Sequence, residues 1–160
     1  MPVTSDPSTS LGAGRRQVTS QTTYLTRERI DAEEWRVRAV DARDGASVDF
    51  VGIARGTEAG RPIDHLDYEA YEPMAEQVIA QLIETARRRW PVHELYVRHR
   101  VGRVEVGEAA VLIGVHAPHR DEAFAACRFL IDAIKRDAPI WKTAHDAQGH
   151  IIEASHVHAD

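Results

Sequence analysis

One segment of the chain, EAAVLIGVHA at positions 108–117, is apolar at odd and even positions alike. Side chains of a β-strand alternate between the two faces of its sheet, so a strand with two apolar faces is expected to be buried. Gly107 permits a turn directly before it. The segment ASVDFVGIAR at positions 46–55 has the same character, and we expect it to be a central strand. The chain is therefore predicted to fold around a sheet.

Two further segments alternate polar and apolar residues in the way of half-buried strands. They are IDHLDYEAY at 63–71, with Leu66 and Tyr68 on its buried face, and ELYVRHRVG at 94–102. We also predict a short strand within 22–28, a polar loop over 57–62 and a short strand pair around residues 148–149.

Helical patterns separate several of these strands. A helix begins near Pro73, which suits a first helical turn, and ends before Pro91, because the residue ahead of a proline avoids helical dihedrals. A second helix is predicted over 119–136, and a third over 30–40 with Asp31 as its cap. Because turns join some strands and helices join others, the predicted class is α+β with a mixed or antiparallel sheet.

The 160 residues suffice for one domain with a core, plus a tail. Residues 1–21 are rich in Ser, Thr, Gly and Pro and have little to bury, so we predict a disordered tail there. The folded domain is predicted over 22–154, and residues 155–160 are predicted to form a C-terminal tail.

Charge and composition exclude several classes of protein. The net charge of −5 argues against general nucleic-acid binding, which normally needs a basic surface. No apolar run approaches the ~20 residues that span a membrane, and the N-terminal residues lack the apolar centre of a secretory signal. The single cysteine, Cys127, excludes an internal disulfide and fits a reducing compartment. We expect a cytoplasmic protein that binds neither nucleic acid nor membranes.

Lys135 and Lys142 stand at the two ends of the segment KRDAPIWK. Ordinary surface lysines are solvated and carry no function. Here Lys135 falls in the last turn of a predicted helix, and Pro139 and Trp141 give the following residues a fixed, partly buried course. A lysine beside packed aromatic surface can serve as a nucleophile, a base or a phosphate clamp. Spacing alone leaves both interpretations open.

His119 and Arg120 lie at the start of the same helix. Helix N-termini favour anions, although a capping or surface pair is an equally simple interpretation. Fifteen positions separate Arg120 from Lys135, which corresponds to about 22 Å along one helix at about 1.5 Å per residue. The two cannot share a small-molecule site within one chain. If both are catalytic, a second subunit must complete the site.

Arg55 follows a predicted strand at the start of a polar loop, which is a usual place for a binding residue. A solvated strand-end arginine is the alternative. Three arginines further along are expected to be solvated or ion-paired: Arg98, Arg100 and Arg103.

His99 and Cys127 lie on apolar faces and are expected in the core. The C-terminal histidines lack an acid or cysteine framework at ligand spacing, so we predict no metal site for His145, His150, His156 and His158. The sequence also has no phosphate-loop or dinucleotide glycine pattern.

Five motifs occur in order within residues 22–154: FVGIAR, LDYEAYEPMA, RRRWPVHELYVRHRVGRVEVGEAAVLIGV, PHRDEAFAACRFLIDAIK and APIWK. In order and spacing they resemble the MoaE family, the large catalytic subunit of molybdopterin synthase. The resemblance implies an α/β-hammerhead fold with a mixed, mainly antiparallel sheet and flanking helices. It also implies a homodimer with one small subunit docked at each end, a heterotetramer.

The resemblance implies a sulfurtransferase of molybdenum cofactor biosynthesis. The partner is a small ubiquitin-like sulfur-carrier subunit, whose C-terminal Gly-Gly is a thiocarboxylate and enters a pocket of the large subunit. The sulfur passes to cyclic pyranopterin monophosphate (precursor Z) and forms the dithiolene of molybdopterin. No metal or redox cofactor is implied, because the sulfur arrives already activated.

The same resemblance assigns site residues. Lys135 becomes the central catalytic group and Lys142 a second catalytic lysine that orients the pterin or its phosphate. Arg55 binds substrate, as do His119 and Arg120, which reach the pocket of the neighbouring subunit. Substrate phosphate and thiocarboxylate are both anions, so positive charge is expected where they lie. His119 is placed to shuttle a proton.

Two departures from the family pattern concern the neighbourhood of these residues. The loop after Arg55 reads Gly56-Thr57-Glu58 where the family commonly reads Asn-His-Asn, and Ala144 stands where the family often has an acid. Two other functions stay open, a pterin- or phosphate-binding homologue without turnover and a dimeric scaffold. Activity with a thiocarboxylated partner would exclude the first, and the second predicts no pocket lined by these residues.

Overall fold

The computed structural model describes residues 23–156, with the side chains of residues 23–155. The predicted N-terminal tail and residues 157–160 of the predicted C-terminal tail lie outside the described residues. In chain order the elements are β1 (Leu25–Thr26), α1 (Glu33–Arg36), β2 (Ala46–Ile53), β3 (Thr57–Glu58), β4 (Arg61–Pro62), β5 (His65–Ala70), α2 (Glu72–Arg89), β6 (Glu94–Arg100), β7 (Gly102–Glu105), β8 (Ala109–Ala117), α3 (Arg120–Asp137), β9 (Ile140–His145) and β10 (Ile151–His156).

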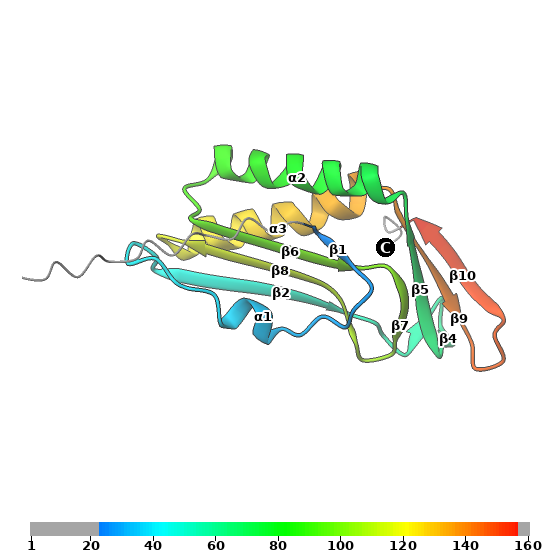
Figure 1. Ribbon diagram of the computed structural model, residues 1–160. Helices are drawn as coiled ribbons and strands as arrows, with labels where there is room; N and C mark the ends of the chain where they lie inside the picture. Colours follow the sequence, from blue (N-terminus) through cyan, green and yellow to red (C-terminus); the bar gives the residue numbers. More distant parts are fainter. Residues whose placement is uncertain (1–22, 157–160) are drawn as a thin grey trace, which may run out of the picture.

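Two four-stranded sheets form the frame of the molecule (Figure 1). The long sheet has the strand order β1-β6-β8-β2, and the shorter sheet, at one end of it, has the order β10-β9-β5-β7. β1 pairs parallel to β6, whereas the other pairs, including the β3–β4 hairpin, are antiparallel. The predicted α+β class with mixed, mainly antiparallel pairing is confirmed.

The long sheet is covered on both faces. Helices α2 and α3 lie over one face, and the short α1 lies against the other (Figure 1). On the helix side, Ile113 and Val115 of β8 belong to the main core, together with apolar residues of both helices. On the α1 side, Leu112 packs in a small cluster with Trp35, which is 1% exposed. This double covering explains why β8 is apolar on both faces, as the sequence predicted.

Strand β2 is an edge strand, so the central position predicted for residues 46–55 is wrong. Its two-sided apolar pattern has another cause. Phe50 is 37% exposed and Ile53 is 58% exposed, so part of the apolar surface of β2 faces outward. Apolar side chains beside an unpaired strand edge are typical of a surface that another chain covers.

The helix predicted over residues 30–40 is also only partly right. It is a single turn whose N-cap is Ala32, so the prediction of Asp31 as the cap is wrong by one residue. Asp31 still supports the helix start, because its Oδ1 atom accepts a hydrogen bond from the Glu33 backbone N–H at 2.9 Å. The residues beyond it have little to pack against, since Val37 is 79% exposed and Val40 is 61% exposed. A helix this short depends on tertiary packing, which here comes from Trp35 alone.

Strand β6 is not half-buried as predicted, because Val97 packs in the main core and Tyr96, on the other face, packs in the cluster with Trp35. The bounds of the remaining elements follow the prediction more closely. α2 ends at Arg89 before Pro91, and β9 and β10 form the strand pair around residues 148–149. The predicted polar loop over 57–62 contains the short β3–β4 hairpin, whose turn residues Ala59 and Gly60 both have positive φ. β10 continues two residues past position 154. No helix within residues 23–156 is long and apolar enough to cross a membrane.

Candidate functional site

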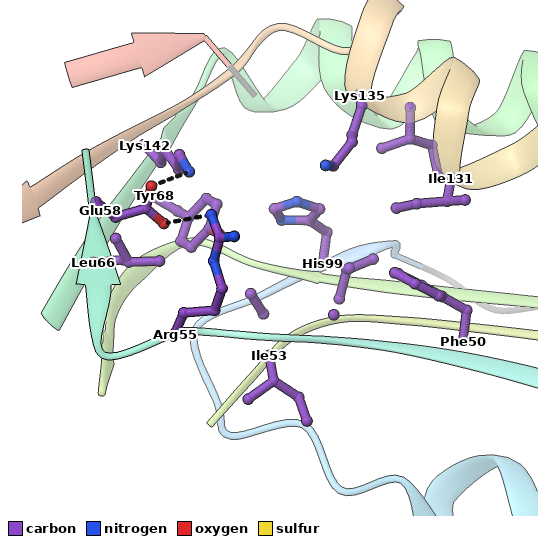
Figure 2. A pocket seen from close by; sticks show the side chains of 14 residues that line it. Phe50, Ile53, Arg55, Glu58, Leu66, Tyr68, His99, Ile131, Lys135 and Lys142 are labelled. Carbon is purple, nitrogen blue, oxygen red and sulfur yellow. Dashed lines mark ion pairs between the residues drawn. The ribbon is translucent and has the colours of Figure 1, made fainter. Parts of the chain in front are cut away.

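A cavity of about 220 Å³ lies where the end of β2, the shorter sheet and the C-terminal half of α3 meet (Figure 2). Apolar side chains such as Leu66 and Ile131 form part of its wall. Its polar and charged lining residues are Arg55, Glu58, Tyr68, His99, Lys135 and Lys142.

The two lysines reach the cavity from different elements. Lys135 comes from the last turn of α3, and Lys142 comes from β9, where it lies opposite Tyr68 of β5. The helix ends at Asp137 and the chain continues through Pro139 into the strand. In Figure 2 both amines point into the cavity from separate walls. Lys135 and Lys142, at the two ends of the segment KRDAPIWK, therefore line the same cavity.

Glu58 forms ion pairs with two cations on one side of the cavity, Lys142 and Arg55. Its carboxylate lies 3.2 Å from Lys142 Nζ and 3.6 Å from the guanidinium of Arg55 (Figure 2). The Glu58 side chain is 7% exposed and that of Lys142 is 14% exposed, so this ion pair is largely shielded from water. Arg55 is 70% exposed and remains accessible from solvent. The loop that departs from the family pattern thus supplies a carboxylate to the second lysine.

Tyr68 and His99 are the neutral polar groups of the lining. Burial, with the nearby Glu58 charge, raises the pKa of Tyr68 to about 12, so its hydroxyl keeps its proton. Burial lowers the pKa of His99 to about 4, although the bond to the Arg100 carbonyl opposes this shift. His99 Nδ1 donates to that carbonyl at 2.7 Å, so the imidazole is neutral with Nε2 unprotonated. Three cationic side chains therefore face one carboxylate, and the cavity favours anions.

Comparison with known proteins identifies the family. The model of the family described as "MoaE protein" matches residues 25–137. A molybdopterin synthase catalytic subunit of Nostoc is 44% identical over 121 residues, which are 75% of this chain and 73% of that protein. The chain belongs to the MoaE family. The resemblance inferred from the motifs is thereby confirmed.

Solved MoaE relatives share the fold. The molybdopterin synthase of Staphylococcus aureus superposes with a TM-score of 0.75 at 35% identity, over 81% of this chain and 95% of that one. A Helicobacter pylori complex of subunits 1 and 2 of molybdopterin-converting factor contains a chain that matches with a TM-score of 0.67 at 25% identity, over 80% of this chain and 86% of that one. This MoaE chain therefore has a role in molybdopterin biosynthesis.

His119 and Arg120 lie away from the cavity. Both stand at the start of α3, where Arg120 is 84% exposed and its guanidinium lies 3.7 Å from Asp121. Neither lines the cavity that holds Lys135. Because α3 is one continuous helix, the separation of about 22 Å expected from the sequence applies within this MoaE chain.

Sequence reasoning missed Glu58, Tyr68 and His99 as lining residues. A signal for Tyr68 existed, because it was predicted on the buried face of its strand. His99 was expected in the core, and its 3% exposure confirms this, but only the fold shows that it also borders the cavity. Nothing in the sequence connects Glu58 with Lys142, which lies 84 positions later.

The remaining candidates have structural partners. Cys127 is buried, and burial raises the pKa of its thiol to about 11, which suits a core residue rather than a nucleophile. Arg98, Arg100 and Arg103 all form ion pairs, with Glu34, with Glu108 and with Asp64 and Glu105.

Within the described residues, one group of side chains has the donor types and the spacing of a metal site, and it lies outside the cavity. It consists of His65, Asp67 and His145. No metal site was predicted for His145, because the residues near it in the sequence lack a ligand framework. His65 and Asp67 lie 80 and 78 positions earlier in the chain.

Proposed function

We propose that this MoaE chain is the catalytic subunit of a molybdopterin synthase that transfers sulfur to cyclic pyranopterin monophosphate (precursor Z). The observation that carries the proposal is the convergence of Lys135 and Lys142 in one positively charged cavity. A relative of 44% identity that is named as this catalytic subunit supports it. The single cysteine and its burial fit the predicted cytoplasmic location.

The lining residues act on two anions, the thiocarboxylate of the sulfur donor and the phosphate of the substrate. Lys135 lies at the thiocarboxylate carbon, where an amine can act as a base or stabilise the negative charge that develops during transfer. Lys142, oriented by Glu58, holds the pterin or its phosphate together with Arg55. The neutral Tyr68 and His99 provide a hydroxyl donor and a ring-nitrogen acceptor in the same cavity.

The sulfur donor is a small ubiquitin-like subunit whose Gly-Gly tail ends as a thiocarboxylate. The Helicobacter pylori relative was solved as a complex of two subunits, which supports such a partner. Glycines fit where a backbone must pass close to the walls of a narrow channel. A terminal anion then needs fixed positive charge at the end of that channel, and Lys135 supplies it.

A second copy of the chain completes the site. Phe50 and Ile53 line the cavity on β2, the exposed edge of the long sheet, and Phe124 on the neighbouring face of α3 is 62% exposed. A groove between β2 and α3 lined by Phe50, Phe124 and Lys135 continues this surface. A homodimer that buries this surface brings the second chain close to the cavity. His119 and Arg120 of that chain then reach the substrate.

Single-turnover conversion of precursor Z with thiocarboxylated small subunit in excess tests the proposal. We expect product with the intact partner and severe loss with a partner that lacks its two terminal glycines. Binding of precursor Z without any conversion would instead establish the non-catalytic homologue. Equal conversion with the truncated partner would exclude insertion of the Gly-Gly tail.

A further inference from the structure

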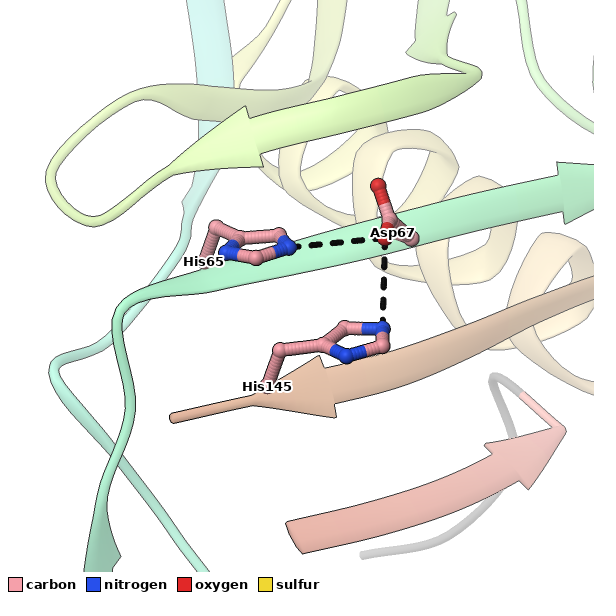
Figure 3. A group of neighbouring side chains, drawn as sticks. All are labelled: His65, Asp67 and His145. Atoms are coloured by element: carbon pink, nitrogen blue, oxygen red, sulfur yellow. Dashed lines mark ion pairs between the residues drawn. The ribbon is translucent and has the colours of Figure 1, made fainter. Parts of the chain in front are cut away.

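His65, Asp67 and His145 form a cluster on the outer face of the shorter sheet (Figure 3). His65 and Asp67 are two residues apart on β5, so their side chains share one face, and His145 lies directly opposite His65 on β9. The two imidazole rings are stacked 4.8 Å apart with an angle of 6° between their planes.

The ligand atoms of the three side chains converge. His145 Nε2 lies 3.2 Å from Asp67 Oδ2, and His65 Nε2 lies 3.5 Å from the same oxygen. Ligand atoms about 2.0–2.1 Å from a tetrahedral zinc ion are about 3.3–3.4 Å from one another. All three ligand atoms lie within 4.8 Å, so a modest tilt of the parallel rings toward each other completes three corners of a tetrahedron.

The neighbours of His65 fix the tautomer that metal binding requires. The carboxylate of Asp64 accepts a hydrogen bond from His65 Nδ1 at 3.0 Å. Nδ1 therefore carries a proton, and Nε2 is the ring nitrogen that faces Asp67. Arg103 Nη1 lies 3.5 Å from this Nε2, which also fits an acceptor there. In metal sites, a histidine ligand usually donates a hydrogen bond from its other ring nitrogen to a group such as a carboxylate.

The charge around the cluster favours a divalent cation. Asp64, Asp67 and Glu105 are acidic, whereas Arg103 is the nearby cation. The guanidinium of Arg103 already pairs with Asp64 at 3.0 Å and with Glu105 at 2.5 Å. Arg103 therefore keeps these two partners when a metal ion replaces it beside His65 Nε2.

We propose that His65, Asp67 and His145 bind one divalent transition-metal ion of the zinc class, with water in the fourth position. Two imidazoles and one carboxylate are ligands that suit zinc. The ion joins β5 to β9. Tyr68 and Lys142 on these same strands point to the opposite face, into the cavity, so the metal is a structural clamp behind the site.

Equilibrium dialysis of the purified full chain against Zn²⁺, with metal analysis, measures the stoichiometry. Co²⁺ provides a second readout, because its visible absorption reports a tetrahedral site with nitrogen ligands. We expect one ion per chain and a rise in melting temperature as Zn²⁺ saturates the site. Asp67→Asn and His145→Gln should each weaken binding by more than about tenfold and remove the rise in melting temperature.

His150→Gln is the matched control. His150 lies beyond the turn of the same hairpin, is 75% exposed and contacts Asp146 instead of the cluster. It should bind Zn²⁺ like the wild type. The far-ultraviolet circular dichroism of each variant without metal shows whether it is folded. Folded Asp67→Asn and His145→Gln chains that retain wild-type affinity would overturn the proposal, as would binding without a tetrahedral Co²⁺ spectrum.

Discussion

Lys135 brings its amine into the cavity from the last turn of α3. If it served only as a helix-end charge, Lys135→Arg would be nearly silent, because either cation interacts favourably with the last carbonyls of a helix. Arginine is bulkier, stays protonated and cannot act as a base. We expect Lys135→Arg to fold normally and to lose turnover by about 10²–10⁴-fold in single-turnover conversion of precursor Z.

Lys142→Arg provides the comparison for this prediction. A charge that orients a phosphate can be replaced in part by another cation, so we expect a smaller loss than for Lys135→Arg. Near-normal rates for Lys135→Arg would mean that only its charge matters, and the catalytic assignment would have to move to another residue.

The Glu58–Lys142 pair predicts energetic coupling at the base of the cavity. Both side chains are largely buried, and removing one partner leaves the other charge poorly solvated. Glu58→Gln and Lys142→Met should each destabilise the chain, whereas the double variant should lose less than the sum. We expect a coupling of about 1–3 kcal/mol in the free energy of unfolding, measured by urea denaturation. Additive losses would show that the pair contributes no coupling.

At the scale of the element, β8 depends on one glycine. A Cβ at Gly114 would lie 2.1 Å from the ring of Trp35, which is almost fully buried. We predict that Gly114→Ala displaces this ring and lowers the free energy of unfolding by about 1–3 kcal/mol. Gly56→Ala is the control, since its Cβ would meet Val106 at an ordinary 3.6 Å. Equal urea midpoints for the two variants would contradict the prediction.

At the scale of the whole molecule, the length of α3 predicts complementation between chains. A Lys135→Ala chain and a chain with His119→Ala and Arg120→Ala should both be inactive alone. Each mixed dimer has one site with wild-type Lys135 from one chain and wild-type His119 and Arg120 from the other. After random reassociation, we expect about a quarter of wild-type activity.

Reassociation must be verified for this experiment, for example by native mass spectrometry of chains with different tags. If mixed dimers form and remain as inactive as their parents, the site is not completed across subunits, and Arg120 and His119 act elsewhere.

The helices and strands could be predicted where local pattern decides structure. α2 and α3 have apolar stripes with proline signals beside them, and β8 is apolar on both faces because layers cover both. The position of β2 could not be predicted, because exposed apolar residues at a sheet edge resemble buried ones in sequence. The length of α1 was also overestimated, since its last residues had no tertiary surface to pack against.

The sequence by itself determined the family and the distance between the ends of α3. It also indicated Lys135, Lys142 and Arg55 as candidate site residues. These properties depend on residue identity and local spacing. Only the tertiary structure decided which distant residues meet. The register of β5 against β9 puts Tyr68 beside Lys142 on one face and His65 beside His145 on the other. The β3–β4 hairpin brings Glu58 to Lys142. The contacts between β5 and β9 arise from strand pairing between remote segments, and the Glu58–Lys142 contact is a side-chain ion pair between remote segments. No local pattern in the sequence records either kind of contact.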